Sequence, residues 1–283
     1  MPTIGSIGVV GAGTMGAGIA QTFAMAGYDV TLVDVAAPQL ERGLMTIESS
    51  LARLEEKKKL HGSPSEILSR IATATDVGAL GHAGLVVEAA FEDPKVKAEL
   101  FAKLDTVVPK AAVLASNTSS ISIDSLASRT GRPDRVAGMH FMNPVPIMTL
   151  VEVVRGPRTS DATLQEVVDL AKKLGKTPVV SADRPGFIAN RVLMPMINEA
   201  FFALEEKVGT AEDIDLVMTL GMNHPIGPLR LADLIGLDVV LAILQVLERD
   251  LGDRKYTPAP IIRRYVEAGD LGRKSGRGVY AYR

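Results

Sequence analysis

The spacing of apolar residues along this chain changes near residue 185, and the change predicts two kinds of structure. Before that point, short runs rich in Val and Ile alternate with longer segments whose apolar residues recur every three or four positions. Such alternation predicts parallel strands joined by helices, which cover both faces of one sheet. From Phe187 almost to the end the spacing is helical. We therefore predict an α/β fold, with a doubly wound sheet over residues 1–185 and an all-α domain over residues 186–283.

The boundaries of the elements follow from this spacing and from the flanking glycines and prolines. We expect strands at residues 4–10, 29–34, 71–75, 85–88, 113–116, 136–140, 150–154 and 177–181. We expect helices in the first domain at residues 17–26, 38–60, 94–108 and 161–174. Pro94 is placed to start one helix, and Gly175 to end another. In the second domain, Pro195 should kink the first helix or mark a close packing point.

The composition narrows the classes of protein that are possible. At a length of 283 residues, a chain usually divides into two domains, each with its own hydrophobic core. A content of 47% apolar residues excludes a disordered chain. A net charge of −2 gives no general attraction to nucleic acid or to anionic membranes. The absence of cysteine excludes disulfides, thiolate catalysis and Cys-ligated zinc, and we expect no metal site. No targeting segment and no membrane-spanning apolar run is visible, so we expect a cytoplasmic protein.

A glycine-rich turn, Gly11–Gly16, follows the first expected strand and opens the first helix. Gly11 permits a tight turn, Gly13 lets the backbone approach a pyrophosphate, and Gly16 allows close packing of helix on sheet. The N-terminus of the helix offers unpaired N–H groups and partial positive charge to that pyrophosphate. This context favours a dinucleotide-binding, Rossmann-type domain, and the alternative is a glycine turn with a purely structural role.

Asp34 ends the second expected strand, 18 residues after the last glycine of the turn. A carboxylate there can accept both hydroxyls of an adenosine ribose, whereas it repels a 2′-phosphate. Two charges about 4 Å apart interact by roughly 4 kcal/mol at an effective dielectric constant of about 20. The position therefore favours NAD over NADP, and the alternative is an acid that only caps a loop.

His140 ends a strand at the expected carboxyl edge of the sheet, where such folds bind their ligands. Glu152 lies 12 residues further on, in the next expected strand. If these strands are neighbours, the carboxylate fixes the tautomer of the imidazole and leaves the other ring nitrogen for proton transfer. The alternative is a structural histidine. Three other histidines lie beside glycine or proline in expected surface turns, and we expect no chemistry from them: His61, His82 and His224.

Two further polar groups leave two interpretations each. The run Ser116–Ser120 follows a strand, so its hydroxyls either cap the next helix or point at a substrate. Arg53 and Lys57 stand four residues apart on one helix. They either form a solvated face that pairs with Glu55 and Glu56, or they bind the phosphates of an anionic substrate.

Together these motifs resemble one enzyme family along essentially all 283 residues. The chain resembles the short, stand-alone L-3-hydroxyacyl-CoA dehydrogenases, and among them the bacterial 3-hydroxybutyryl-CoA dehydrogenases. The resemblance rests on residues 9–16, 116–120, 140–146, 150–153, 185–191 and 272–280. Two departures stand out: Met142 replaces a phenylalanine of the family, and Ser49 and Ser50 stand where relatives often have a lysine. The second departure leaves the CoA-phosphate contacts open.

The resemblance implies reversible, NAD-dependent oxidation of an (S)-3-hydroxyacyl-CoA to the 3-oxoacyl-CoA. It implies that His140 is the catalytic base and Glu152 its orienting acid. It also implies that Ser119 and Asn190 hold the 3-oxygen of the substrate, and that Asn143 lies near nicotinamide and substrate. The residues implied to bind the cofactor are Gly11, Gly13, Thr14, Met15, Gly16, Asp34, Glu92, Lys97 and Asn117.

The partners follow from the same resemblance. It implies an acyl-CoA substrate of short chain, such as 3-hydroxybutyryl-CoA, an activity of fatty-acid metabolism, and a homodimer held by the C-terminal helices. No nucleic acid or membrane partner is expected. Two alternatives stay open: a dehydrogenase of a CoA-free hydroxyacid, and a non-catalytic protein that binds NAD on the same scaffold. The acyl chain length and the pathway stay open as well.

Overall fold

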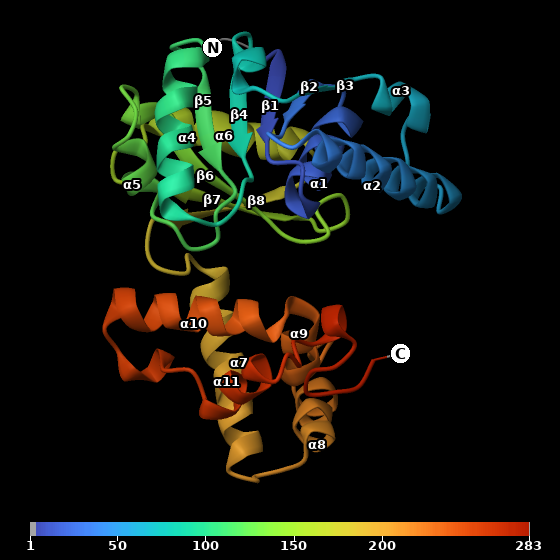
Figure 1. The fold of residues 1–283 in the computed structure, drawn as a ribbon, viewed down its shortest axis with the longest axis vertical. Helices are drawn as coiled ribbons and strands as arrows, with labels where there is room; N and C mark the ends of the chain where they lie inside the picture. The colour runs from blue at the N-terminus through green and yellow to red at the C-terminus, as the bar shows by residue number, and fades with distance from the viewer. Residues whose placement is uncertain (1–3, 283) are drawn as a thin grey trace. The chain divides into compact units, whose positions relative to one another are not determined.

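The structure, a computed structural model, describes residues 4–282. It divides into two compact units, of which the first ends at Asp183 and the second begins at Arg184. The first unit contains a sheet with helices on both faces, and the second is helical (Figure 1). The predicted α/β fold with an all-α C-terminal part is therefore confirmed.

One sheet organises the first unit, and its strands run in the order β3-β2-β1-β4-β5-β6-β7-β8. The strands are β1 (Ser6–Val10), β2 (Asp29–Val33), β3 (Ile71–Ala74), β4 (Leu85–Glu88), β5 (Val113–Ser116), β6 (Val136–Phe141), β7 (Leu150–Arg155) and β8 (Thr177–Ala182). Neighbouring strands are parallel except β6 and β7, which are antiparallel. The order reverses between β1 and β4, and α/β sheets bind ligands beyond the carboxyl ends of the strands at such a point.

Helices cover both faces of this sheet, which explains why β4, β5 and β6 are buried along their length and mostly apolar. The helices are α1 (Thr14–Met25), α2 (Ala37–Glu56), α3 (Pro64–Leu68), α4 (Pro94–Val107), α5 (Ile123–Ala127) and α6 (Asp161–Lys173). α1, α2 and α6 share a core with Val87 and Ala115 on one face. Val86 and Leu114 alternate to the other face, which α4 covers (Figure 1).

The second unit packs its helices around one apolar core. Its helices are α7 (Ala189–Glu205), α8 (Ala211–Leu216), α9 (Pro228–Ile235), α10 (Leu237–Leu251) and α11 (Pro260–Glu267). α7 runs through Pro195 and contributes Met194, Ile197 and Phe201 to the core, a helical spacing. The C-terminal tail is fastened to α9 because the buried Asp233 accepts from two backbone N–H groups of the tail and from the Tyr282 hydroxyl.

The observed elements differ from the predicted ones mainly at helix ends. α2 ends at Glu56 and not near residue 60, because Lys58 takes a left-handed conformation with φ of 54°. Two short helices, α3 and α5, were not predicted, since five residues are too few to show a period. Each begins at a serine whose side chain caps it, Ser63 and Ser122. Across residues 4–282, no helix has both the length and the apolar character needed to cross a membrane.

Candidate active site

The glycine turn lies between β1 and α1 and leaves an open space over its second glycine. Gly11 has φ of 101°, and a Cβ there would collide with the backbone of Ala89. A Cβ on Gly16 would collide with the carbonyl oxygen of Gly11, so α1 can pack this closely only through a glycine. At Gly13, in contrast, an added Cβ would meet nothing within 4 Å. The turn is therefore tight on its protein side and open where a pyrophosphate would approach.

The start of α1 and the end of β2 complete this turn. Thr14 and Met15 open α1, and no side chain caps its first N–H groups, since the N-cap residue is Gly13. Asp34 follows β2, and its two carboxylate oxygens accept from the N–H groups of Ala12 at 2.8 Å and Ala36 at 3.0 Å. The Asp34 carboxylate therefore caps two loops, as the alternative interpretation expected. Each of its oxygens still has a second lone pair that can accept from a ribose hydroxyl. These residues fit a dinucleotide.

His140 and Glu152 stand opposite each other on the antiparallel strands β6 and β7. The imidazole Nδ1 lies 2.9 Å from Oε2 of Glu152, and both residues are buried. This contact fixes the orientation of the ring and directs Nε2 to the side away from the carboxylate. Because β6 is parallel to β1, β4 and β5 in one sheet, His140 lies at the same edge as the glycine turn.

The loop that follows His140 carries Asn143, which is exposed, and the loop is held from two sides. Lys176 donates from Nζ to the carbonyl oxygens of Val145 at 2.6 Å and Met148 at 2.8 Å. Burial lowers the pKa of this lysine. A Cβ on Gly18 of α1 would lie 2.9 Å from Cβ of Val145, so the glycine admits this contact. Lys176 was not predicted from the sequence, because nothing in its neighbourhood along the chain distinguishes it.

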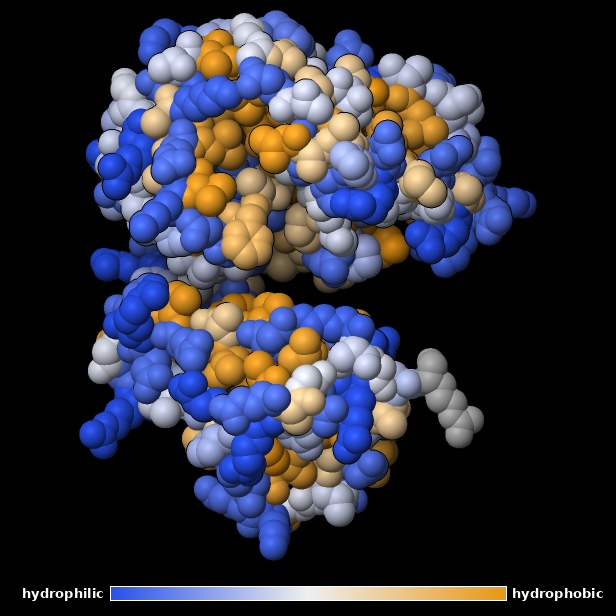
Figure 2. Space-filling view, in the orientation of Figure 1, coloured by the Kyte–Doolittle hydropathy of each residue, from blue (hydrophilic) through white to orange (hydrophobic). Residues whose placement is uncertain are grey.

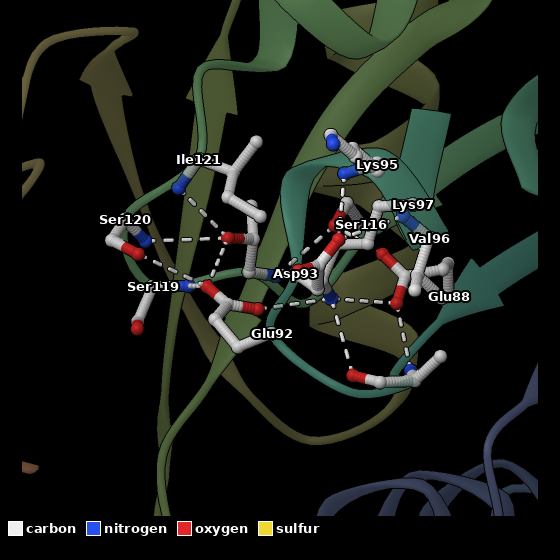
Figure 3. Close-up of polar contacts among 12 residues, drawn as sticks. Glu88, Glu92, Asp93, Lys95, Val96, Lys97, Ser116, Ser119, Ser120 and Ile121 are labelled. Atoms are coloured by element: carbon white, nitrogen blue, oxygen red, sulfur yellow. Dashed lines mark hydrogen bonds and ion pairs between the residues drawn. The ribbon is translucent and has the colours of Figure 1, made fainter. Parts of the chain in front are cut away.

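The serine-rich run after β5 is tied to the neighbouring strands and to Glu92. Ser119 donates its backbone N–H to Oε1 of Glu92 at 3.1 Å, and the Ser120 hydroxyl donates to the same oxygen at 3.2 Å (Figure 3). Asn117 accepts at Oδ1 from the N–H of Phe141 at 2.8 Å, which ties this run to the strand of His140. Of the two earlier interpretations, capping of the next helix by this run is wrong, because the serine that caps α5 is Ser122. A contact of Ser119 with substrate stays a prediction.

Lys97 of α4 is buried and pairs with two carboxylates. Its Nζ lies 2.6 Å from Oε1 of Glu88 and 3.0 Å from Oε2 of Glu92 (Figure 3). Burial raises the pKa of Glu92, but Lys97, the Thr118 hydroxyl and the N–H of Ser119 outweigh it and hold that pKa below its usual value. Glu88 was not predicted from the sequence. An acid at the end of an apolar strand, like Asp34, is the signal that points to it.

The remaining candidate residues lie on other elements of the fold. Asn190 is buried in the first turn of α7, within the second unit. Arg53 and Lys57 are exposed at the end of α2. The other histidines lie in turns, with His61 and His82 exposed and His224 half-buried. Within residues 4–282, no group of three or more His, Asp or Glu side chains is arranged to hold a metal ion.

A doubly wound sheet with this glycine turn, this aspartate and a histidine–glutamate pair at one edge defines an NAD-dependent oxidoreductase. The family follows from comparison with known sequences. Residues 6–184 match the family described as "3-hydroxyacyl-CoA dehydrogenase, NAD binding domain", and residues 186–282 match "3-hydroxyacyl-CoA dehydrogenase, C-terminal domain". The chain belongs to the 3-hydroxyacyl-CoA dehydrogenase family. The predicted resemblance and the predicted cofactor, NAD, are thereby confirmed.

Similar proteins cover the chain almost from end to end. It is 54% identical over 275 residues to the "Probable 3-hydroxybutyryl-CoA dehydrogenase" of Deinococcus radiodurans, which spans 97% of this chain and 99% of that protein. It is 51% identical over 281 residues to the 3-hydroxybutyryl-CoA dehydrogenase of Bradyrhizobium diazoefficiens, covering 99% and 96% of the two chains. The crystal structure of (S)-3-hydroxybutyryl-CoA dehydrogenase PaaH1 from Ralstonia eutropha matches with a TM-score of 0.95 and 49% identity. The match covers 99% of this chain and 100% of that chain.

Proposed function

We propose that this protein catalyses the reversible, NAD-dependent oxidation of a short-chain (S)-3-hydroxyacyl-CoA, such as 3-hydroxybutyryl-CoA, to the 3-oxoacyl-CoA. The observation that carries the proposal is the pair of His140 and Glu152, 2.9 Å apart at the sheet edge that also holds the glycine turn. A chain that only bound NAD would have no need of a buried carboxylate against an imidazole.

In this proposal His140 is the general base. It takes the proton of the 3-hydroxyl at Nε2 while the bond from C3 to hydrogen breaks and the C–O bond becomes a carbonyl. Bound NAD supplies the acceptor for the hydride that leaves C3. In reverse, protonated His140 returns the proton to the oxygen. Glu152 stabilises the imidazolium in both directions, because its carboxylate is buried beside Nδ1.

The other candidates hold the reactants. Ser119 and Asn190 are proposed to hold the 3-oxygen of the substrate, and Asn143 to lie near nicotinamide and substrate. The glycine turn, Thr14 and Met15 are proposed to hold the pyrophosphate at the start of α1. Asp34 is proposed to hold the adenosine ribose. The family resemblance supports these assignments, and the open space at Gly13 supports the one for the pyrophosphate.

Two further residues that contact the cofactor, one that acts through them and two that contact the substrate belong to the proposal. Glu92 and Asn117 are proposed to contact the cofactor directly, since both are at least partly accessible at the sheet edge. Lys97 is 1% exposed, so we propose that it acts on the cofactor through Glu92. Arg53 and Lys57 are proposed to contact the phosphates of CoA, because both are exposed cations on α2.

We also propose that the protein is a cytoplasmic homodimer of fatty-acid metabolism, held by helices of the second unit. Apolar residues gather on the visible face of the unit that carries α7–α11 (Figure 2). The exposed apolar side chains of this unit include Val192, Leu216, Leu220, Met222 and Leu234. Light scattering of the purified protein tests the dimer: a mass of one 30.0-kDa chain at micromolar concentration contradicts it.

The activity is tested by following the loss of NADH with acetoacetyl-CoA and with longer 3-oxoacyl-CoAs. We expect turnover that is highest with the shortest chains. Free acetoacetate serves as the control for the CoA handle. Turnover of the free acid but not of its thioester supports a dehydrogenase of CoA-free hydroxyacids. A protein that binds NADH but turns over neither class of substrate supports the non-catalytic alternative.

A further inference from the structure

Glu88 is a buried carboxylate to which no role has been assigned so far. It ends β4, between β1 and β5, and its side chain has no exposed surface. Its Oε1 accepts from Nζ of Lys97 at 2.6 Å and from the N–H of Ala90 at 2.7 Å. Its Oε2 accepts from the Ser116 hydroxyl at 2.6 Å. Both oxygens are therefore engaged, and the partners come from β5, α4 and the segment between β4 and α4.

Two routes lead from Glu88 to the loop that carries Ser119 (Figure 3). One passes through Lys97 to Glu92, whose Oε1 accepts from the Ser119 N–H and from the hydroxyls of Thr118 and Ser120. The other passes through the Ser116 hydroxyl, which accepts from the N–H of Thr118 at 3.1 Å. Thr118 in turn accepts at Oγ1 from the N–H groups of residues 120 and 121.

The same strand end also touches the glycine turn. The N–H of Ala89 donates to the carbonyl oxygen of Val10 at 2.7 Å, and the N–H of Asn117 donates to the Glu88 carbonyl oxygen at 2.7 Å. A Cβ on Gly11 would collide with the backbone of Ala89. Glu88 thus ends the strand that lies between β1, which carries the glycine turn, and β5, which carries the serine-rich run.

A buried ion pair of this kind needs an explanation other than stability. Taking both charges out of water costs several kcal/mol, so well-packed apolar residues would stabilise the fold about as well. What a fully satisfied polar network supplies is one defined geometry, because every member loses a partner when the arrangement shifts. The network around Glu88 ends at the serine loop, and that loop is what it holds in place.

We propose that Glu88 is a positioning residue for Ser119: through Lys97 and Glu92, and through Ser116, it fixes the loop so that Ser119 can hold the oxygen of the substrate. This inference rests on the proposed function, in which Ser119 contacts that oxygen. A small displacement of a group that orients a substrate can cost up to about 100-fold in rate. Glu88 itself need touch neither substrate nor cofactor.

The test is a double-mutant cycle of Glu88→Gln and Ser119→Ala, read as kcat/KM for acetoacetyl-CoA. We expect each single variant to lose about 10-fold to 100-fold. We expect the double variant to lose no more than about twofold beyond Ser119→Ala, because two residues that act as one unit are not additive. Losses that multiply in the double variant, or unchanged kcat/KM in Glu88→Gln, overturn the proposal.

Asp105→Asn is the matched control. Asp105 lies near the other end of α4 from Lys97 and forms a comparable pair with the buried Arg132, at 2.6 Å. We expect Asp105→Asn to lower the melting temperature as Glu88→Gln does, while kcat/KM stays within twofold. An equal loss of kcat/KM in both variants shows that weakened packing of α4 is the cause, and contradicts positioning. If Glu88→Gln does not fold, Ser116→Ala enters the same cycle, since it removes only one hydroxyl.

Hydrogen exchange separates this inference from the proposed function. If the wild-type protein does not turn over acetoacetyl-CoA, the proposed function fails, but the loop can still be examined directly. We then expect Glu88→Gln to speed exchange of the amides of residues 118–121 by about 10-fold, and Asp105→Asn to leave them unchanged. Unchanged exchange in Glu88→Gln overturns the positioning role, whether or not the protein is active.

Discussion

Replacing Glu152 with glutamine tests the core of the proposed chemistry, since it removes one charge and little else. The side chain is 1% exposed and its Oε2 lies 2.9 Å from Nδ1 of His140. A glutamine fills the same volume and can still accept a hydrogen bond at its amide oxygen. What is lost is the attraction between carboxylate and imidazolium, the form of His140 that exists after it has taken the proton.

The magnitude follows from the contact distance. At an effective dielectric constant of about 20, two unit charges 2.9 Å apart interact by roughly 6 kcal/mol. A remaining neutral hydrogen bond contributes about 1 to 2 kcal/mol of this, so the imidazolium loses on the order of 4 kcal/mol. Each 1.36 kcal/mol is tenfold in rate, so we expect kcat to fall by about 1000-fold.

The assay is the loss of NADH with acetoacetyl-CoA at saturating concentrations, together with the NADH dissociation constant from fluorescence. We expect that constant to change less than twofold, because Glu152 lies behind the histidine and not in the glycine turn. Glu166→Gln is the matched control. Glu166 lies on α6, and its carboxylate pairs with Arg135 at 2.9 Å. A kcat within threefold of wild type in Glu152→Gln would refute the reasoning.

Four other predictions follow from the contacts described above. His140→Gln should lose about 10² to 10⁴ in turnover and keep NADH binding, which the same two assays check. Gly13→Ala should leave the melting temperature unchanged but weaken NADH binding, whereas Gly16→Ala should lower the melting temperature. Equal melting temperatures of the two variants would contradict the contacts at the turn. Asp233→Asn should lower the unfolding free energy in urea by about 1 to 3 kcal/mol, because its partners in the tail lose a buried acceptor. Burial and the hydrogen bond to the Asp233 carboxylate raise the pKa of Tyr282 from 10.0 to about 12. The contribution of Tyr282 to the unfolding free energy is therefore complete below pH 10 and is lost as the pH rises to 12. Tyr282→Phe should flatten the plot of unfolding free energy against pH between these values.

Local signals were sufficient for much of the framework. The glycine turn follows from residue types at fixed offsets, since only glycine tolerates the backbone contacts at Gly11 and Gly16. The strands β1, β4, β5 and β6 could be predicted because each is a short, largely buried run with two covered faces. Helices of five residues escaped prediction, since one turn and a half shows no period.

The sequence by itself determined the kind of fold and the glycine turn, and it pointed to the proposed acid and base, because these features depend on residue types close together along the chain. Only the tertiary structure decided which side chains meet. The antiparallel pairing of β6 and β7 places Glu152 against His140, and a register shifted by one residue would turn either side chain to the other face. The side-chain partners of Glu88 lie 9 and 28 residues away, and Lys176 reaches carbonyl groups 31 and 28 residues away. No local pattern encodes such contacts, since they depend on strand order and on how a helix crosses the sheet.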